Sequence, residues 1–86
     1  MFYVYILRTS SDTLYIGQTN NLERRMSEHT SKSVKSAKYI RYFLSFELVY
    51  SEKYQTRSEA MKREIELKKL TRAKKEELIA SLVGIL

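Results

Sequence analysis

The sequence predicts an α+β domain in which a small, mainly antiparallel three-stranded sheet is flanked by helices, in the order ββα–β–αα. Three observations predict this fold. Two short segments rich in aromatic and β-branched residues flank a polar loop near the N-terminus, a third follows in mid-chain, and the last third carries helix-capping residues and helical spacing. The 86 residues fit one domain, residues 1–86, and leave no room for a second core.

The predicted strands have the composition that pleated, half-buried segments favour. Residues 3–8 predict the first strand, the polar stretch 9–13 predicts a hairpin loop, and residues 14–18 predict the second strand. Residues 46–51 alternate between apolar and polar side chains well enough to predict a third strand. The hairpin is the clearest local prediction in the chain.

A first helix is predicted directly after the hairpin. Asn20 and Asn21 are candidate N-caps, because their side-chain oxygens can accept from backbone N–H groups at a helix start. Leu22, Met26 and His29 then recur at helical spacing, which predicts a helix over residues 22–29. Residues 30–45 show no clean period, so we expect a loop there with room for a single helical turn.

Two further helices are predicted in the C-terminal third. Thr56 and Glu59 have the spacing of a capping box, which opens a helix running to about residue 70. Thr71 is the candidate cap of a last helix, and Gly84 is its candidate stop. The apolar face of that last helix consists of Leu78, Ile79, Leu82 and Val83.

Composition excludes several classes of site. The chain has no cysteine, which excludes a disulfide framework, a thiol nucleophile and a thiolate zinc site, and its single histidine, His29, excludes a histidine-rich metal site. No apolar run approaches the roughly 18 residues of a membrane span. The N-terminal segment is too short for a signal peptide, so we expect no membrane partner and a cytoplasmic location.

Positive charge is concentrated in one segment. The net charge is +6, and residues 53–75 hold nine Lys and Arg residues against three Glu residues. Such a segment favours a polyanionic partner such as nucleic acid. A lysine-rich, solvated helix surface explains the same pattern equally well.

Glu64 occupies an unusual position for a carboxylate. Helical spacing groups Ala60, Met61 and Leu67 on the inward face, and Glu64 falls among them. A carboxylate there costs free energy unless it is paired, hydrated or bound to a cation. The alternative is a glutamate at the rim of the core, paired with Lys68 one turn later. The position fits both interpretations equally.

Arg25 and His29 are neighbours at i and i+4 on the first helix, beside Leu22 and Met26. Arginine offers a fork of donors suited to phosphate oxygens, and histidine exchanges a proton near neutral pH. A histidine on an apolar helix face is more often a hydrogen-bonded core residue, and that alternative stays open here.

Three tyrosines of the hairpin are further candidates. Tyr3 and Tyr5 point to the same side of the first strand, so both can face one pocket, and Tyr15 lies on the second strand near Gly17. Tyrosines in strands are usually packing residues, which is the simpler interpretation. Gly17 permits a bulge or a close approach of another group to the backbone.

The combined pattern resembles the GIY-YIG endonuclease superfamily. The two elements that name it correspond to YVY at residues 3–5 and YIG at residues 15–17, followed by a similar run at 18–25 into the first helix. Residues 58–64 resemble the segment that carries the metal-binding glutamate of the family. The resemblance covers nearly the whole chain and is closest to short, stand-alone bacterial members, which are similar to the nuclease domain of the DNA-repair enzyme excinuclease ABC.

The resemblance implies a GIY-YIG nuclease fold and a metal-dependent endonuclease acting on DNA. Tyr5 and Tyr15 would contact the attacking water or the scissile phosphate, one of them as general base. Arg25 would stabilise negative charge on the phosphate, and His29 would assist proton transfer or contact the phosphate. Glu64 would hold one divalent cation, Mg²⁺ or Mn²⁺. Tyr3 and Gly17 would be structural parts of the site.

Some features depart from the family pattern or leave alternatives open. The first motif begins with Tyr3 instead of glycine, and an asparagine that some relatives carry near the C-terminal end of the domain is not found. A chain of this length would obtain DNA selectivity from its own surface, a homodimer or a partner protein. A nucleic-acid-binding or adaptor module with little catalysis is the alternative function. The residues expected to contact backbone phosphates are Lys32, Lys35, Lys38, Arg41, Lys62, Lys68, Lys69 and Arg72.

Overall fold

The computed structural model describes residues 1–31 and 46–85. Its helices and strands follow the predicted order ββα–β–αα, which confirms the fold class. The elements are β1 (Phe2–Thr9), β2 (Leu14–Thr19), α1 (Leu22–Ser31), β3 (Phe46–Tyr54), α2 (Arg57–Lys69) and α3 (Arg72–Ile85). The predicted loop over most of residues 30–45, with Lys32, Lys35, Lys38 and Arg41, lies outside the described residues. Within the described part, no helix combines the length and the apolar content of a membrane span.

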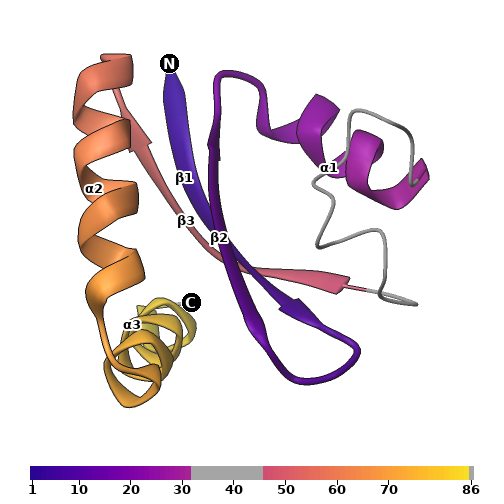
Figure 1. The fold of residues 1–86 in the computed structure, drawn as a ribbon, viewed down its shortest axis with the longest axis vertical. Coiled ribbons are helices and arrows are strands. Elements are labelled where there is room, and N and C mark those ends of the chain that lie inside the picture. The colour runs from indigo at the N-terminus through magenta and orange to yellow at the C-terminus, as the bar shows by residue number, and fades with distance from the viewer. Residues whose placement is uncertain (32–45, 86) are drawn as a thin grey trace.

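The three strands form one antiparallel sheet in the order β2-β1-β3. β1 is therefore the central strand, and Tyr5 lies opposite Gly17 on β2 and Ser51 on β3. Figure 1 shows α2 and α3 on one side of the sheet and α1 on the other. Because both faces are covered, the middle of β1 is buried on both sides and forms a continuous buried run.

Alternation along β1 divides the buried residues into two clusters. Val4 and Ile6 point toward α2 and α3 and pack in one cluster; its other buried members are Ile16, Ala60, Leu67 and Ile79. Tyr5 and Leu7 point to the opposite face, where their neighbours are Tyr15, Leu22, Met26 and Phe46. The second cluster contains Tyr5 and Tyr15, two of the three tyrosines singled out from the sequence. The period of two in β1 therefore separates a purely apolar core from a face that carries polar groups.

The hairpin loop closes on hydrogen bonds between Thr9 and Thr13. The backbone N–H of Thr9 donates to the carbonyl of Thr13 at 2.9 Å, and their hydroxyls lie 2.6 Å apart. Asp12 adopts the left-handed conformation with φ 62, which aspartate tolerates better than most residues. Arg8 donates to Asp12 and also to Glu76 on α3, which fixes the loop against the last helix.

The helix caps of the C-terminal third match the sequence prediction. Thr56 and Glu59 form a complete capping box at the start of α2, and the N–H of Lys74 donates to the hydroxyl of Thr71 at 3.2 Å at the start of α3. The predicted stop at Gly84 is wrong, because α3 continues to Ile85. A lone glycine lowers helix propensity by about 1 kcal/mol but does not itself force the chain out of the helix.

The inward face of α2 differs from the prediction at one position. Ala60 and Leu67 are fully buried, whereas Met61 is 44% exposed. At about 100° per residue, Leu67 and Glu64 lie within about 40° of Ala60, whereas Met61 is about 100° away. Met61 therefore falls outside the buried sector, and Glu64 remains close to it.

β3 extends three residues beyond its prediction, to Tyr54, and a polar cluster accompanies the extension. Glu52 on β3 accepts hydrogen bonds from the hydroxyls of Tyr50 and Tyr54 and from two nitrogens of Arg63 on α2, at 2.8 and 3.1 Å. Burial alone raises the pKa of Glu52, but these hydrogen bonds outweigh burial and lower it. The cluster attaches α2 to the end of β3.

Candidate active site

Three rings meet on the face of the sheet that α1 covers. The ring centroids of Tyr5 and Tyr15 are 6.5 Å apart, and that of His29 lies 6.2 and 6.0 Å from them, edge-on in both cases. The hydroxyl of Tyr5 is 3.2 Å from Nε2 of His29, within hydrogen-bonding distance. Tyr5 is 1% exposed and His29 is 0% exposed. The strand and helix residues predicted as candidates therefore form one contiguous, enclosed cluster.

Gly17 makes room for the Tyr5 side chain. The two residues are paired across β1 and β2, and the phenol of Tyr5 passes over the Gly17 backbone. A Cβ atom on Gly17 would lie 2.5 Å from the Tyr5 hydroxyl oxygen and 2.7 Å from Cζ, which is closer than carbon atoms approach one another. The absence of a side chain at residue 17 thus lets the hydroxyl reach its position.

Arg25 joins the cluster from α1, one turn before His29. Its side chain is 22% exposed, and its guanidinium forms an ion pair with Glu28 at 3.1 Å. Burial lowers the pKa of Arg25, but hydrogen bonds to Tyr5 and Glu28 more than offset this and raise it. Arg25 therefore presents a fixed positive charge between the enclosed rings and the solvent.

The environment keeps both proton-carrying groups of the cluster neutral at pH 7. Burial raises the pKa of Tyr5 to about 12, against the lowering effect of Arg25. Burial and the nearby charge of Arg25 lower the pKa of His29 to about 4. Nδ1 of His29 is buried without a hydrogen-bond partner. The hydrogen bond of the His29 ring is therefore made by Nε2, with the Tyr5 hydroxyl.

Glu64 lies on α2, which covers the other side of the sheet. Its side chain is 20% exposed and lies 2.9 Å from Nζ of Lys68, so the predicted pair on α2 is present. The charge of Glu64 also contributes to the raised pKa of Tyr5, which places the carboxylate in the electrostatic neighbourhood of the cluster. A pair at i and i+4 is worth only a few tenths of a kcal/mol, so Lys68 is a weak competitor for a divalent cation.

The donor set at Glu64 fits Mg²⁺ or Mn²⁺ better than a softer metal. No group of three or more His, Asp or Glu side chains converges within the part of the chain that the structure describes. Magnesium commonly keeps several waters and takes one or two carboxylates together with substrate phosphates. The single carboxylate of Glu64, 20% exposed, is consistent with that mode of binding.

The structure brings together six of the seven residues predicted for the site itself, with Gly17 against Tyr5, and places Tyr3 at a neighbouring hollow. Tyr5, Tyr15, Arg25, His29 and Glu64 are linked by the contacts and charge effects described above. Tyr3, expected beside Tyr5, instead lines a neighbouring hollow of about 530 Å³; the other lining residues are Asn20, Asn21, Leu22, Glu23, Met26 and Leu48.

Two neighbours of the cluster were not predicted from the sequence. Phe46, the first residue of β3, packs edge-on against His29 with ring centroids 5.7 Å apart. Glu28 pairs with Arg25. The i, i+3 spacing of Arg25 and Glu28 in the sequence indicates their ion pair. The contact between His29 and Phe46 depends on how β3 packs against α1, which no local sequence pattern indicates.

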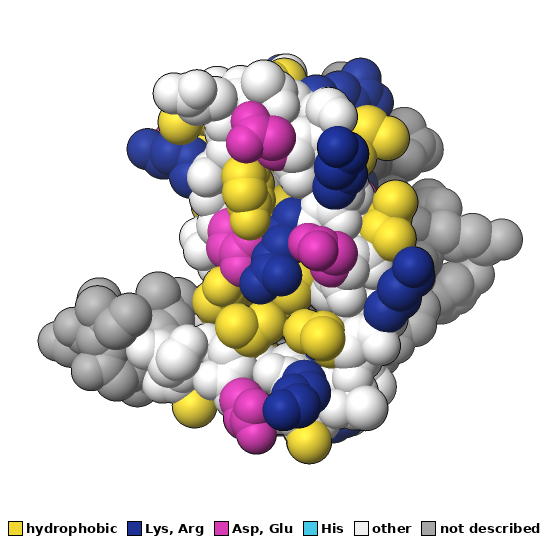
Figure 2. All heavy atoms as spheres, turned by 90° about the vertical axis from the view of Figure 1, so that its left-hand side faces the viewer, with side chains coloured by type: hydrophobic (Ala, Val, Ile, Leu, Met, Phe, Trp, Pro, Cys, Tyr) yellow, Lys and Arg dark blue, Asp and Glu magenta, His cyan; other side chains and the backbone are white. Residues whose placement is uncertain are grey.

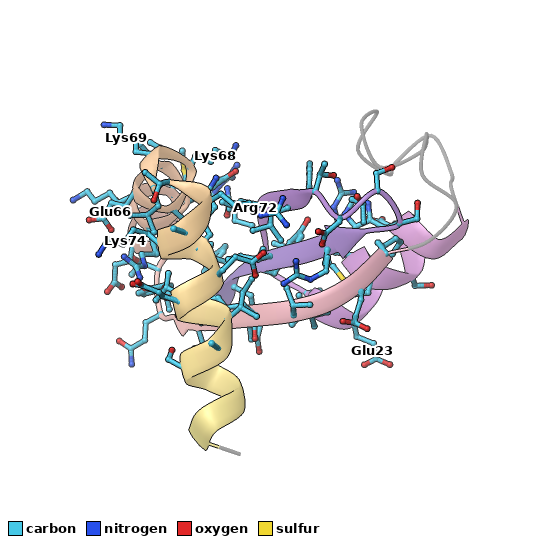
Figure 3. All side chains as sticks on the ribbon, turned by 90° about the horizontal axis from the view of Figure 1, so that it is seen from below. Glu23, Glu66, Lys68, Lys69, Arg72 and Lys74 are labelled. Carbon is cyan, nitrogen blue, oxygen red and sulfur yellow. The ribbon has the colours of Figure 1, made fainter. Side chains whose placement is uncertain are left out.

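The predicted phosphate contacts on α2 and α3 do not form one continuous patch. On the face formed by α2, Lys and Arg side chains are separated by acidic and hydrophobic ones (Figure 2). Figure 3 shows Lys69 extending away from the sheet and Glu23 lying on the side of α1. Lys62 and Lys69 are exposed, and Arg72 is paired with Asp12 and Glu76. Part of the basic segment is thus engaged within the molecule.

Relatives of the chain are small proteins of similar length. A UPF0213 protein from Natronomonas pharaonis is 48% identical over 82 residues, which cover 95% of this chain and 94% of the relative. A UPF0213 protein from Clostridium perfringens is 46% identical over 81 residues, covering 94% and 85%.

Solved structures and a family match agree with the geometry. The solution NMR structure of a UPF0213 protein from Bacillus halodurans is 41% identical with a TM-score of 0.59, and the match covers 93% of this chain and 84% of that chain. A solution NMR structure from E. faecalis is 36% identical with a TM-score of 0.62, at 93% and 83% coverage. Residues 1–77 match the GIY-YIG catalytic domain. With its tyrosine pair, arginine and glutamate held on this fold, the chain belongs to the GIY-YIG family of nuclease domains.

Proposed function

We propose that the protein is a divalent-metal-dependent endonuclease that hydrolyses phosphodiester bonds in DNA, with weak sequence specificity or selectivity for branched, nicked or single-stranded structures. One observation carries the proposal: a single hydroxyl, that of Tyr5, lies in contact with His29 and Arg25 and within the field of Glu64. Hydrolysis of a phosphodiester needs a group that activates water, a positive charge on the phosphate and stabilisation of the leaving oxygen. These residue types supply all three.

Arg25 acts as the charge clamp. The transition state of phosphoryl transfer places more negative charge on the phosphate oxygens than the ground state does, and a preorganised guanidinium stabilises that charge without reorganising. Glu28 fixes the guanidinium from one side at 3.1 Å, so its orientation is set before the substrate binds. The partial exposure of Arg25 leaves the fork accessible to a phosphate.

Tyr5 and His29 handle the proton of the attacking water. In the tautomer that carries its proton on Nδ1, the neutral imidazole accepts a hydrogen bond at Nε2 from the Tyr5 hydroxyl, and the lone pairs of the phenol oxygen are left for the water. When water attacks the phosphorus, its proton passes to the Tyr5 oxygen as the phenolic proton moves to Nε2 of His29. The ring of Tyr15 packs against the rings of Tyr5 and His29 and contacts the substrate.

Glu64 is the proposed ligand of one Mg²⁺ or Mn²⁺ ion. Bound there, the ion supplies Lewis-acid polarisation of the phosphate and stabilises charge on the leaving oxygen. Glu64 would hold the ion, and Arg25 would supply a second positive charge to the phosphate. Release of Lys68 from Glu64 frees that ammonium for the DNA backbone.

DNA is the proposed partner along the basic surface. The exposed side chains of Lys62, Lys68 and Lys69, with Arg72, contact backbone phosphates in a salt-sensitive manner that is indifferent to sequence. Selectivity for a DNA structure comes from this surface, from a homodimer or from a partner protein. The cytoplasmic location belongs to the same proposal, because the substrate is intracellular DNA.

One observation favours a second candidate, a nucleic-acid-binding module without catalysis. Tyr5 and His29 are enclosed, and an enclosed hydroxyl has limited contact with solvent water. The carboxylate near the hydroxyl favours the enzyme, since a binding module has no need for negative charge beside a phosphate site. The two candidates differ in whether DNA is cut in the presence of a divalent cation.

The test is cleavage of plasmid, single-stranded and branched DNA with Mg²⁺, with Mn²⁺ and with a chelator. Arg25→Ala and Glu64→Ala each reduce the rate by about 100-fold or more, provided that unfolding curves show folded proteins. Lys74→Ala and Glu77→Ala, which remove the same charges from the exposed surface of α3, leave the rate unchanged. Metal-independent cutting, or cutting that survives both site variants, contradicts the proposal. Salt-sensitive binding without cutting supports the binding module.

A further inference from the structure

A polar hollow beside the candidate active site is lined by three arginines. Its volume is about 360 Å³, and the start of β1, the end of β2, the first turns of α1 and the start of α2 all contribute to it. The lining residues are Phe2, Gln18, Thr19, Asn20, Arg24, Arg25, Glu28 and Arg57. We call this the arginine hollow.

Positive charge in the arginine hollow is only partly compensated. Among the described residues that line it, Glu28 is the one carboxylate, and it is paired with Arg25. Arg24 is held by the neutral side chain of Asn20, whose oxygen accepts at 3.1 Å, so its charge is oriented but not neutralised. Among the described residues, no ion pair engages Arg57. Two guanidinium groups therefore face the hollow with their charge available.

Uncharged groups of the hollow favour the same kind of ligand. Gln18, Thr19 and Asn20 add side-chain donors, and α2 begins at the wall of the hollow, at Arg57. Helix N-termini carry partial positive charge and favour anions. A planar guanidinium fork matches phosphate oxygens better than a point charge does. The guanidinium groups and neutral donors of the hollow together favour a phosphate group as ligand.

Arg25 connects the arginine hollow to the candidate active site. It lines the hollow and also contacts Tyr5, so a phosphate in the hollow and a phosphate at Tyr5 would share one arginine. We propose that the arginine hollow binds a second phosphate of the same DNA strand, an internal phosphodiester next to the one that is cut, with Arg24 and Arg57 as its direct ligands. This assignment rests on the proposed function and deepens it: the hollow fixes the strand in register with the reacting group.

The experiment measures binding of a fluorescent single-stranded oligonucleotide by anisotropy, with chelator present, at salt concentrations from about 50 to about 200 mM. Arg57→Gln and Arg24→Gln are each expected to reduce the slope of log K against log salt by about 1, so that their binding defect shrinks about threefold across this range. The control Lys74→Gln removes one positive charge from α3, where Figure 3 shows the side chain extending away from the sheet. Lys74→Gln is expected to leave the slope of log K against log salt unchanged. If all three variants have the same slope, the proposal is overturned.

Two further comparisons define the ligand. Wild type is expected to bind oligonucleotides with a 5′-phosphate and a 5′-hydroxyl equally, as an internal phosphodiester requires. A preference for the 5′-phosphate that Arg57→Gln abolishes would overturn this assignment in favour of a strand-end phosphate. Arg57→Lys is expected to restore the slope but only part of the affinity, because the charge returns without the fork. Arg24 and Arg57 are exposed, so thermal unfolding should match wild type and exclude misfolding.

Failure of this proposal and failure of the nuclease proposal are distinguishable, since the binding assay needs neither metal nor cleavage. Lost slope in Arg57→Gln together with no cutting by wild type supports the arginine hollow and contradicts the nuclease. Normal cutting by wild type, with binding and cutting unchanged in Arg57→Gln, supports the nuclease and contradicts the arginine hollow. Absence of any salt-sensitive binding by wild type overturns both.

Discussion

Each residue of the candidate site owes its chemistry to what surrounds it. Tyr5 alternates with Ile6 and so points away from the apolar core, and its pKa rises because it is buried. His29 is kept neutral by the same burial and by Arg25. The tyrosine, arginine and glutamate positions could be predicted from their order and spacing. Their protonation could not, because it depends on neighbours from β1, β2 and α1 that meet only in the folded chain.

Replacing Gly17 tests the packing of Tyr5 over the β2 backbone. Gly17→Ala forces the Tyr5 ring to move, because the new methyl group would lie 2.5 Å from its hydroxyl oxygen. We expect a stability loss of about 1–3 kcal/mol in chemical denaturation and a loss of the Tyr5–His29 contact.

The matched control is Gly84→Ala, at a glycine inside α3. Alanine is the better helix former, so this variant should be as stable as wild type or slightly more stable. Equal behaviour of the two variants would mean that Tyr5 does not lie over residue 17.

The depressed pKa of His29 predicts a loss of stability in acid. The pKa is about 4 in the folded protein against an ordinary value of 6.5, so the unfolded chain takes up a proton first as the pH falls. Stability is therefore lost progressively between pH 6.5 and pH 4, by roughly 3 kcal/mol in all. His29→Phe, which keeps a ring in the cluster, should flatten this part of the stability curve measured by urea unfolding.

The charge states of the groups facing His29 bear on this measurement. Arg25 on α1 and the phenol of Tyr5 keep their charge states across the window, and Glu28 is the carboxylate among the described groups that acts on His29. Because Glu28 is present in both proteins, subtracting the two curves removes its contribution. Parallel curves for wild type and His29→Phe would show that His29 is not the group responsible.

At the scale of elements, local signals were reliable and contacts between elements were not. The capping box at Thr56 and Glu59 and the strand composition of the hairpin gave boundaries within a residue or two. The extension of β3 to Tyr54 was missed, since it accompanies the contact of Glu52 with Arg63 on another element. Met61 was misplaced because it is apolar and follows Ala60 directly, although helical geometry puts it about 100° from Ala60 and outside the buried sector of α2.

The Glu52–Arg63 contact gives a prediction about how α2 is attached. Arg63→Met removes two hydrogen bonds to Glu52 and leaves a mostly buried carboxylate with only its two tyrosine donors. Chemical denaturation should show a loss of about 2 kcal/mol. Glu66→Gln, which removes only the 3.6 Å surface pair of Arg63, should cost less than about 0.5 kcal/mol. Similar losses in both variants would assign the effect to the surface pair.

At the scale of the whole molecule, the candidate site depends on both layers of the fold. α1 brings Arg25 and His29 to one face of the sheet, and α2 brings Glu64 from the other side (Figure 1). β2 lies at the edge of the sheet. Because Gly17 on β2 has no side chain, the Tyr5 hydroxyl can lie over the β2 backbone at this edge. The prediction of which residues form the candidate site came from resemblance to a family. The arginine hollow was not predicted, because its residues come from four separate places in the chain.

The most direct test of the central claim is the rate of plasmid cleavage by wild type and Glu64→Gln, measured side by side across a Mg²⁺ titration. Glutamine keeps the size of the side chain and removes its charge. Our account predicts Mg²⁺-dependent cleavage by wild type and a loss on the order of 100-fold or more in the variant at every Mg²⁺ concentration, with unfolding curves that show both proteins folded. Equal cleavage by the two proteins, with the same dependence on Mg²⁺, would contradict the assignment of Glu64 and with it the proposed mechanism.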